Sequence, residues 1–289
     1  MLHHQYRLRT VTVVNALSVD VEEYYHALIF REATECIDRR SFPSRVEESV
    51  ERVLTLLGHD QIRATFFILG EVAAAHPAMV RKIGGEGHEI ACHGERHELV
   101  GSQTPEEFRA DIRRAKARLE DLTSHRVIGY RAPNFSIGGQ QTWAYDVLLE
   151  EGFRYDSSIY PIVHDRYGRP SAPRFTYEIR RNGDQTLLEF PIGTARFLRV
   201  NLPIGGGGYF RLLPLHLIRW GIDDVNTREG QPIMFYFHPW ELDPDQPRPQ
   251  MPWRHRIRHY LGVERQEAKL SSLFRQVRFS TARDILRIP

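Results

Sequence analysis

Two histidines spaced four residues apart, His93 and His97, are the first residues of this sequence whose types and spacing could do chemistry. On a helical turn, this spacing would place both imidazoles on one face, within reach of a single divalent ion. An acidic side chain from the segment Asp20-Val21-Glu22-Glu23 would complete a set of two histidines and one carboxylate. Three protein ligands leave a coordination position for water, as in catalytic metal sites. We therefore predict a metal site, with Glu22 as the carboxylate ligand and Glu23 as the alternative.

Other ionisable residues follow apolar segments that are typical of buried strands. Arg131 follows one such segment and His238 another, just as Asp20 comes at the end of the first. In α/β folds the carboxyl ends of parallel strands meet at one edge of the sheet, and functional residues gather there. These three side chains are therefore expected to surround one pocket together with the two histidines.

The elements that must position these residues are strands that alternate with amphipathic helices. Strands are predicted at 11–19, 64–69, 89–92 and 127–130, and later at 187–190 and 233–237. Apolar residues repeating every three or four positions predict helices near 46–57, 72–83, 105–119 and 143–149. Capping boxes are expected at two of the helix starts, Ser44 with Glu47 and Thr104 with Glu107. The alternation, which continues to about residue 156, predicts parallel βα units in a barrel or a doubly wound sheet.

The remainder of the chain is less regular. Residues 159–210 contain several prolines and a run of four glycines, and such loops often form a binding rim over a rigid scaffold. A proline-rich stretch, 239–252, precedes a helix that is predicted at 264–279. We interpret residues 1–289 as one domain, of which about 246–289 form a C-terminal helical appendage.

Composition and charge exclude several classes of protein. The 289 residues are 41% hydrophobic and 26% charged, which is typical of a globular protein and excludes a disordered one. The net charge is +2, so the chain lacks the basic excess of a nucleic-acid-binding protein. Two cysteines, Cys36 and Cys92, are too few for a disulfide framework, and a single bridge between them is left open. Because the sequence has neither an apolar run of 18 residues nor an export signal at its beginning, we expect a cytoplasmic protein without a transmembrane helix.

Five short motifs follow one another along the chain. They are Ser18-Val19-Asp20-Val21-Glu22, residues 87–97, Gly129-Tyr130-Arg131-Ala132-Pro133, Tyr155-Asp156-Ser157-Ser158 and Phe237-His238-Pro239-Trp240. In content and order they resemble the motifs of the NodB-homology polysaccharide deacetylases, carbohydrate esterase family 4, over almost the whole chain. Residues 205–211 (GGGGYFR) and the C-terminal region resemble the exosortase-associated (PEP-CTERM) exopolysaccharide deacetylases within that family. The resemblance implies an α/β fold, a distorted (β/α) barrel of about seven parallel strands.

The resemblance also implies roles for the residues of the metal site. Glu22, His93 and His97 would hold zinc or another divalent transition metal, and Asp20 would be the general base that activates the attacking water. Arg131 would orient Asp20 and keep it ionised through a charge-assisted hydrogen bond. The chain departs from the commoner family pattern at position 94, where a glycine replaces the usual Ser or Thr.

Two further roles follow from the resemblance. Protonated His238 would be the general acid that donates to the leaving amine, and Asp156 would pair with His238 and keep it charged. The backbone N–H near Phe135 would hold the oxyanion, and exposed aromatic rings would stack on sugars. The expected substrate-binding residues are Pro133, Phe135, Tyr209 and Trp240.

We predict a metal-dependent hydrolase that removes N-acetyl groups from amino sugars of a polysaccharide or its precursor. One alternative is hydrolysis of a different amide, such as a peptidoglycan N-acetyl group or a cyclic ureide. Another is a catalytically silent carbohydrate-binding protein. The expected partner is an N-acetylated glycan. The basic run at 254–259 fits contact with an anionic glycan or with a membrane that carries a lipid-linked glycan, and it fits a solvated helix face equally well. We make no prediction of the oligomeric state.

Overall fold

The computed structural model describes residues 13–27, 30, 42–164 and 166–289. Cys36 and the beginning of the first predicted strand lie outside these residues. Cys92 is buried and carries a free thiol. Among the helices of the described ranges, none combines the length and the apolar character needed to cross a membrane.

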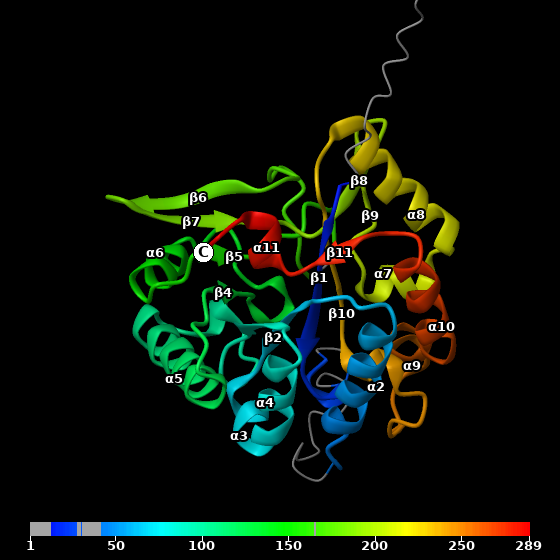
Figure 1. The fold of residues 1–289 in the computed structure, drawn as a ribbon, viewed down its shortest axis with the longest axis horizontal. Coiled ribbons are helices and arrows are strands. Elements are labelled where there is room, and N and C mark those ends of the chain that lie inside the picture. Colours follow the sequence, from blue (N-terminus) through cyan, green and yellow to red (C-terminus); the bar gives the residue numbers. More distant parts are fainter. Residues whose placement is uncertain (1–12, 28–29, 31–41, 165) are drawn as a thin grey trace, which may run out of the picture.

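Seven parallel strands form the sheet at the centre of the described structure (Figure 1). Their order is β10 (Met234–Phe237), β1 (Asn15–Val21), β2 (Thr65–Ile68), β3 (Glu89–Cys92), β4 (Gly129–Tyr130), β5 (Tyr155–Asp156) and β7 (Gln185–Glu189). An antiparallel strand, β6 (Tyr177–Asn182), pairs with β7. Just beyond β7, Ile192 forms a parallel bridge to Met234 of β10, so the two ends of the sheet meet. The predicted distorted barrel of about seven parallel strands is confirmed.

Strand β1 lies between β10 and β2 and carries the first acidic motif. All of its residues are buried, as expected for a strand that is covered on both faces. Because alternate side chains of a strand share a face, Ser18 and Asp20 point to the same side, and Glu22 continues this row just past the strand. The carboxylates of Asp20 and Glu22 therefore lie on the same side of the sheet.

The helices between the strands begin and end for local reasons. Helix α5 (Pro105–Thr123) has the predicted capping box, since Thr104 and Glu107 bond to each other's backbone N–H. The single helix predicted at 72–83 is instead two helices, α3 (Gly70–Ala75) and α4 (Pro77–Gly85). The break lies before Pro77, which has no N–H to continue a helical ladder.

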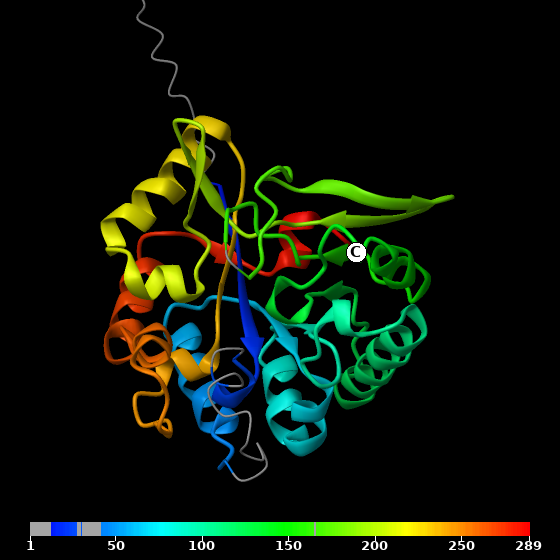
Figure 2. The same ribbon diagram turned by 180° about the vertical axis from the view of Figure 1, so that it is seen from behind.

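Two more helices cover this half of the barrel, and one of them starts differently from the prediction. The capping box predicted at Ser44 is wrong, because α2 (Val46–His59) has no side-chain cap and the Ser44 hydroxyl donates to the carboxylate of Glu23. Helix α6 (Trp143–Glu150) follows β4. Figure 1 shows α5 and α6 on one side of the barrel and α7 to α10 on the other, and Figure 2 shows the same division from behind.

The second half of the chain contributes more than a helical appendage. After a hairpin of β8 (Thr194–Phe197) and β9 (Val200–Pro203) come α7 (Gly207–Leu212), α8 (Leu215–Asp224), α9 (Trp253–Tyr260) and α10 (Val263–Phe274). The predicted last helix ends earlier than expected, at Phe274. The following strand, β11 (Phe279–Ser280), pairs in parallel with β1, and α11 (Ala282–Leu286) closes the chain.

Candidate active site

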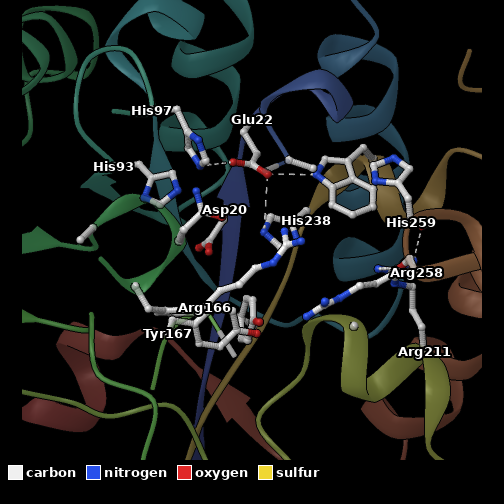
Figure 3. A pocket seen from close by; sticks show the side chains of 17 residues that line it. Asp20, Glu22, His93, His97, Arg166, Tyr167, Arg211, His238, Arg258 and His259 are labelled. Atoms are coloured by element: carbon white, nitrogen blue, oxygen red, sulfur yellow. Dashed lines mark hydrogen bonds and ion pairs between the residues drawn. The ribbon is translucent and has the colours of Figure 1, made fainter. Parts of the chain in front are cut away.

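The carboxyl ends of β1, β3 and β10 meet around one pocket, as predicted, but Arg131, which was expected there too, is not among its lining residues. Its lining includes Asp20 and Glu22 from β1 and the turn after it, His93 and His97 from the loop after β3, and His238 after β10. Figure 3 shows these five side chains pointing toward one another. All are buried or nearly so, which strengthens the electrostatic interactions between them.

Glu22, His93 and His97 form the predicted ligand set. One ligand atom from each lies within 4.8 Å of the others, and all three residues are buried. Glu22 Oε2 lies 2.6 Å from His97 Nε2. His93 Nδ1 lies 2.8 Å from the carbonyl oxygen of Arg131, so its N–H can donate there and leave Nε2 as the lone-pair nitrogen.

The protonation of the two kinds of ligand suits a cation. Burial lowers the pKa of His93 to about 4, so its imidazole is neutral at ordinary pH. Burial by itself would raise the pKa of Glu22, but its electrostatic interactions and hydrogen bond with the neighbouring histidines lower the pKa well below its usual value. Neutral imidazole nitrogens and a carboxylate are the donors that a divalent transition metal requires. The residues present therefore fit such an ion.

The two histidines do not lie on a helical turn, contrary to the prediction. They lie on a loop that follows β3, in which Gly94 and His97 have positive φ angles of +81° and +56°. The loop brings the imidazoles together by reversing the chain. An added Cβ at position 94 would lie 3.0 Å from Asp111 Oδ2, and the positive φ also favours glycine. Both features favour a glycine at position 94.

The structure also distinguishes Glu22 from Glu23. Glu23 points away from the two histidines, because neighbouring side chains of an extended segment face opposite sides. Its carboxylate accepts hydrogen bonds from the Ser44 hydroxyl and, at 3.0 Å, from the Arg45 backbone N–H. Glu23 therefore holds the start of α2, and Glu22 is the acidic residue that joins the histidine pair.

Asp20 is paired with Arg131, which is completely buried. Arg131 Nη1 donates to Asp20 Oδ1 at 2.5 Å and to Ser18 Oγ at 2.9 Å. Its other nitrogens donate to the carbonyl and hydroxyl oxygens of Ser157, and its guanidinium lies 4.1 Å from the centre of the Phe67 ring. These contacts fix the guanidinium and, through it, one oxygen of Asp20.

His238 is paired with a residue that the sequence did not predict. We expected Asp156 as its partner, and that expectation is wrong: His238 Nδ1 lies 2.7 Å from Oε1 of Glu241, three residues along the chain. His238 Nε2 lies 3.6 Å from Glu22 Oε1. Burial by itself would lower the pKa of His238, but Glu22 and Glu241 raise it to about 9.

Glu241 is a completely buried carboxylate with several donors. It accepts from the side chain and backbone N–H of His238, and from Gln266 Nε2 of α10 at 3.0 Å. Arg211 Nε lies 3.1 Å from its other oxygen. Burial favours the neutral acid, but Arg211 and His238 lower the pKa of Glu241 below its usual value, so it is ionised.

Asp156 instead belongs to a buried pair with Glu189 of β7. Asp156 Oδ1 accepts from Ser158 Oγ at 2.5 Å, and Glu189 Oε1 accepts from the Ile159 N–H. Burial raises the pKa of Asp156 to about 6, and burial together with the Asp156 charge raises that of Glu189 well above its usual value. One proton is therefore shared by the two carboxyl groups near neutral pH.

Glu189→Gln should change how stability depends on pH. Above about pH 5 the unfolded chain has lost the Glu189 proton that the folded chain keeps, so folding binds a proton and wild-type stability falls as pH rises. A glutamine amide donates to Asp156 without titrating. The free energy of unfolding of Glu189→Gln, relative to wild type, should therefore increase between pH 5.5 and pH 7.5, by at most about 1.4 kcal/mol per pH unit.

Denaturant unfolding of both proteins at the two pH values measures this difference. Glu267→Gln, at an exposed site on α10, is the matched control and should show no such trend. An equal difference from wild type at both pH values for Glu189→Gln would contradict the shared proton.

The predicted substrate-binding residues are only partly placed as expected. Phe135 and Trp240 line the pocket, whereas Pro133 and Tyr209 are not among its lining residues. Trp240 cannot stack on a sugar, because its ring lies between those of His238 and His259 at centroid distances of 5.0 and 4.6 Å. Its Nε1 donates to Glu22 Oε1 instead.

The backbone N–H of Phe135 is also used within the protein. It donates to the carbonyl oxygen of Ala132 at 3.0 Å, and its role as an oxyanion donor stays a prediction. Asn134 and Phe135 both have φ angles of +52°. Consecutive positive φ angles at two non-glycine residues are costly and occur mainly at functional sites.

Several lining residues were missed by the sequence analysis. They are Ala27, Ala132, Asn134, Arg166, Tyr167, Gly208, Arg211, Tyr236, Arg258 and His259. Tyr236 could have been found, since it lies two residues before His238 in a strand and therefore on the same face. The others come from loops and from α7 and α9, whose approach to the pocket depends on the tertiary fold.

Two family models match adjacent parts of the chain. The model described as polysaccharide deacetylase matches residues 37–148, which carry the histidine motif and Arg131. A model described as a domain of unknown function (DUF3473) matches residues 157–287, which carry His238 and Glu241.

Curated relatives match the first part of the chain. A peptidoglycan deacetylase of Helicobacter pylori is 27% identical over 113 residues, 39% of this chain and 38% of that protein. A peptidoglycan-N-acetylglucosamine deacetylase of Bacillus cereus is 34% identical over 88 residues, 30% of each chain. The chain thus matches about a third of the length of these relatives.

Solved structures share the fold over nearly the whole chain. A probable polysaccharide deacetylase from Pseudomonas aeruginosa PAO1 has a TM-score of 0.62 at 16% identity, covering 95% of this chain and 89% of the other. Puue allantoinase has a TM-score of 0.61 at 19% identity with the same coverage. At such identities the likeness concerns the fold.

Proposed function

We propose that this chain, whose resemblance to the NodB-homology polysaccharide deacetylases is supported by the family model and the curated relatives, is a metal-dependent N-deacetylase of amino sugars. The observation that carries the proposal is the grouping of Asp20, His238 and the Glu22, His93 and His97 ligand set around one pocket. These are a candidate base, a candidate acid and a cation site, which together suit hydrolysis of an amide.

Glu22, His93 and His97 would hold the ion, for which zinc is our choice. When bound, it supplies a Lewis acid that polarises the amide carbonyl and makes a water molecule more acidic. Asp20 takes the proton of the attacking water, because its carboxylate faces the pocket and Arg131 fixes its orientation. Protonated His238 donates to the amine nitrogen as the C–N bond breaks, and Glu241 stabilises its charge.

As substrate we propose an N-acetylated glycan of the exopolysaccharide class, in line with the resemblance of residues 205–211 to the exosortase-associated deacetylases. Peptidoglycan is the second candidate, since the relatives named above are peptidoglycan deacetylases. A cyclic ureide is the third candidate substrate, because the fold is similar to that of an allantoinase.

Acetate release tests the proposal and separates these candidates. The zinc-loaded protein is incubated with N-acetylglucosamine oligomers, a crude N-acetylated exopolysaccharide, peptidoglycan and allantoin. We expect acetate from the oligomers and the exopolysaccharide. Hydrolysis of allantoin without acetate release from any glycan would contradict deacetylation and favour the ureide, whereas no hydrolysis of any substrate would favour a binding protein.

Glu241→Gln should lower kcat by about 10- to 100-fold and leave KM nearly unchanged. Glutamine keeps an oxygen that accepts from the His238 Nδ1–H but removes the charge that stabilises the imidazolium. Glu241→Asp keeps the charge and should recover part of the lost rate. Steady-state acetate release gives kcat and KM for wild type and both variants. Full activity of Glu241→Gln would contradict the assignment of Glu241 as the residue that stabilises protonated His238.

A further inference from the structure

Exposed apolar side chains of this protein are concentrated in one part of the chain. Among the described residues, ten large apolar side chains are exposed, and all but Val163 lie between residues 197 and 261. One group belongs to the β8–β9 hairpin and α8. The other consists of Leu212 at the end of α7, Trp253 and Ile257 on α9, and Leu261 just after it. Clustered exposed apolar residues mark interaction surfaces.

Helix α9 is oriented against the usual amphipathic pattern. Trp253 and Ile257 are one turn apart and are 66% and 49% exposed, so they form an apolar stripe that faces solvent. The side that faces the protein carries His259, which is buried and stacked on Trp240. A surface helix ordinarily buries its apolar face, so this reversal requires a partner other than the protein's own core.

Arginines border the apolar stripe. Arg254, Arg256 and Arg258 are exposed, and the sequence has no acidic residue from 247 to 263. A helix with Trp and aliphatic residues next to arginines is typical of segments that lie in the headgroup region of an anionic bilayer. A second copy of the same surface is a poorer partner, because it would bring like charges together.

The apolar surface continues beyond the helix, and the same helix also contributes to the catalytic pocket. Leu212 and Leu261 line a common groove between α7 and the end of α9. On the other side of α9, Arg258 lines the pocket that holds Asp20 and Glu22, as Figure 3 shows. Helix α9 therefore carries the apolar stripe on one side and a residue of the pocket lining on another.

We propose that Leu212, Trp253, Ile257 and Leu261, with Arg254, Arg256 and Arg258, form a docking surface for anionic phospholipid membranes. Trp253 and the aliphatic side chains enter the interfacial region, and the arginines contact lipid phosphates. Docking holds the mouth of the pocket beside the bilayer. The proposal does not depend on the chemistry of the pocket, so binding is tested without substrate.

The test is flotation of the full-length protein with vesicles of phosphatidylcholine alone and with about 30% phosphatidylglycerol. Wild type should float with the anionic vesicles, and raising the salt from about 0.1 M to about 0.5 M should weaken binding. Trp253→Ser with Ile257→Ser should lower the partition coefficient at least about tenfold. The matched control is Leu217→Ser with Trp220→Ser, which removes two exposed apolar residues from α8 and should bind like wild type.

Several results would overturn the proposal. Wild type that stays unbound on anionic vesicles, or binding that is lost in the α8 variant and kept in the α9 variant, would exclude α9 as the docking surface. A dimer that the α9 variant dissociates, without vesicle binding, would assign the surface to a second copy. Equal denaturant midpoints of the variants and wild type establish that each variant is folded, and because the substituted side chains are exposed we expect them to be equal.

Discussion

Asp20→Asn is expected to lower kcat for acetate release by about 10²- to 10⁴-fold, the range for loss of a general base. The asparagine oxygen can still accept the hydrogen bond from Arg131 Nη1, so the buried guanidinium keeps a partner and the fold is retained. The amide cannot take a proton from water. Because Asp20 is not one of the three ligands, zinc affinity should change by less than about tenfold.

Asp156→Asn is the matched control for this variant. Asp156 is also a buried aspartate at the end of a strand, but it faces Ser158 and Glu189 rather than the pocket. We expect this control to keep kcat within about tenfold of wild type, since it makes no contact with the pocket. Equal losses in both variants would contradict the assignment of Asp20 as the base, as would an active Asp20→Asn enzyme.

Glu22→Gln should remove the metal and the activity together. A neutral amide replaces the one anionic ligand of the set, so zinc affinity should fall by at least about 10²-fold, more than is usual for residues that merely support a ligand. Competition of each protein with a chromogenic chelator measures the affinity, and acetate release on the same samples gives the activity. The activity of Glu22→Gln should recover as zinc is raised toward its weakened dissociation constant.

The adjacent residue provides the control for this substitution. Glu23→Gln should bind zinc within a fewfold of wild type, because its carboxylate contacts Ser44 and Arg45. Its expected cost is in stability, about 1 kcal/mol from weakened hydrogen bonds at the start of α2. If Glu23→Gln lost zinc while Glu22→Gln kept it, Glu23 would be the metal ligand and our assignment of Glu22 would be wrong.

The parts of the fold that could be predicted are those fixed by local pattern. The apolar runs around Asp20 and before His238 predict strands because a buried parallel strand is apolar throughout. The start of α5 at Thr104 follows from a capping box that lies within four residues. Position at a strand end then predicted that Asp20, His93 and His238 share the pocket, but Arg131, which was predicted on the same ground, is buried behind Asp20 and is not among the lining residues.

The errors around His238 have both a local and a distant origin. The partner of His238 is Glu241 rather than Asp156, because Glu241 follows three residues later in the turn that begins at His238. Arg211 of α7 and Gln266 of α10 contact the same carboxylate. Trp240 is unavailable for sugar stacking because His259 of α9 covers its second face. The spacing of His238 and Glu241 is local and could have suggested their pairing, whereas the contact of Trp240 with His259 joins two different elements and leaves no local pattern.

One metal ion at Glu22, His93 and His97 should enable deacetylation, and a zinc titration measures this dependence. Zinc is added to chelator-treated protein while acetate release from N-acetylglucosamine oligomers is followed. The rate should rise from near zero in proportion to the zinc added and level off at one equivalent per chain. Full activity of the metal-free protein, or tight binding of one zinc without acetate release, would contradict it.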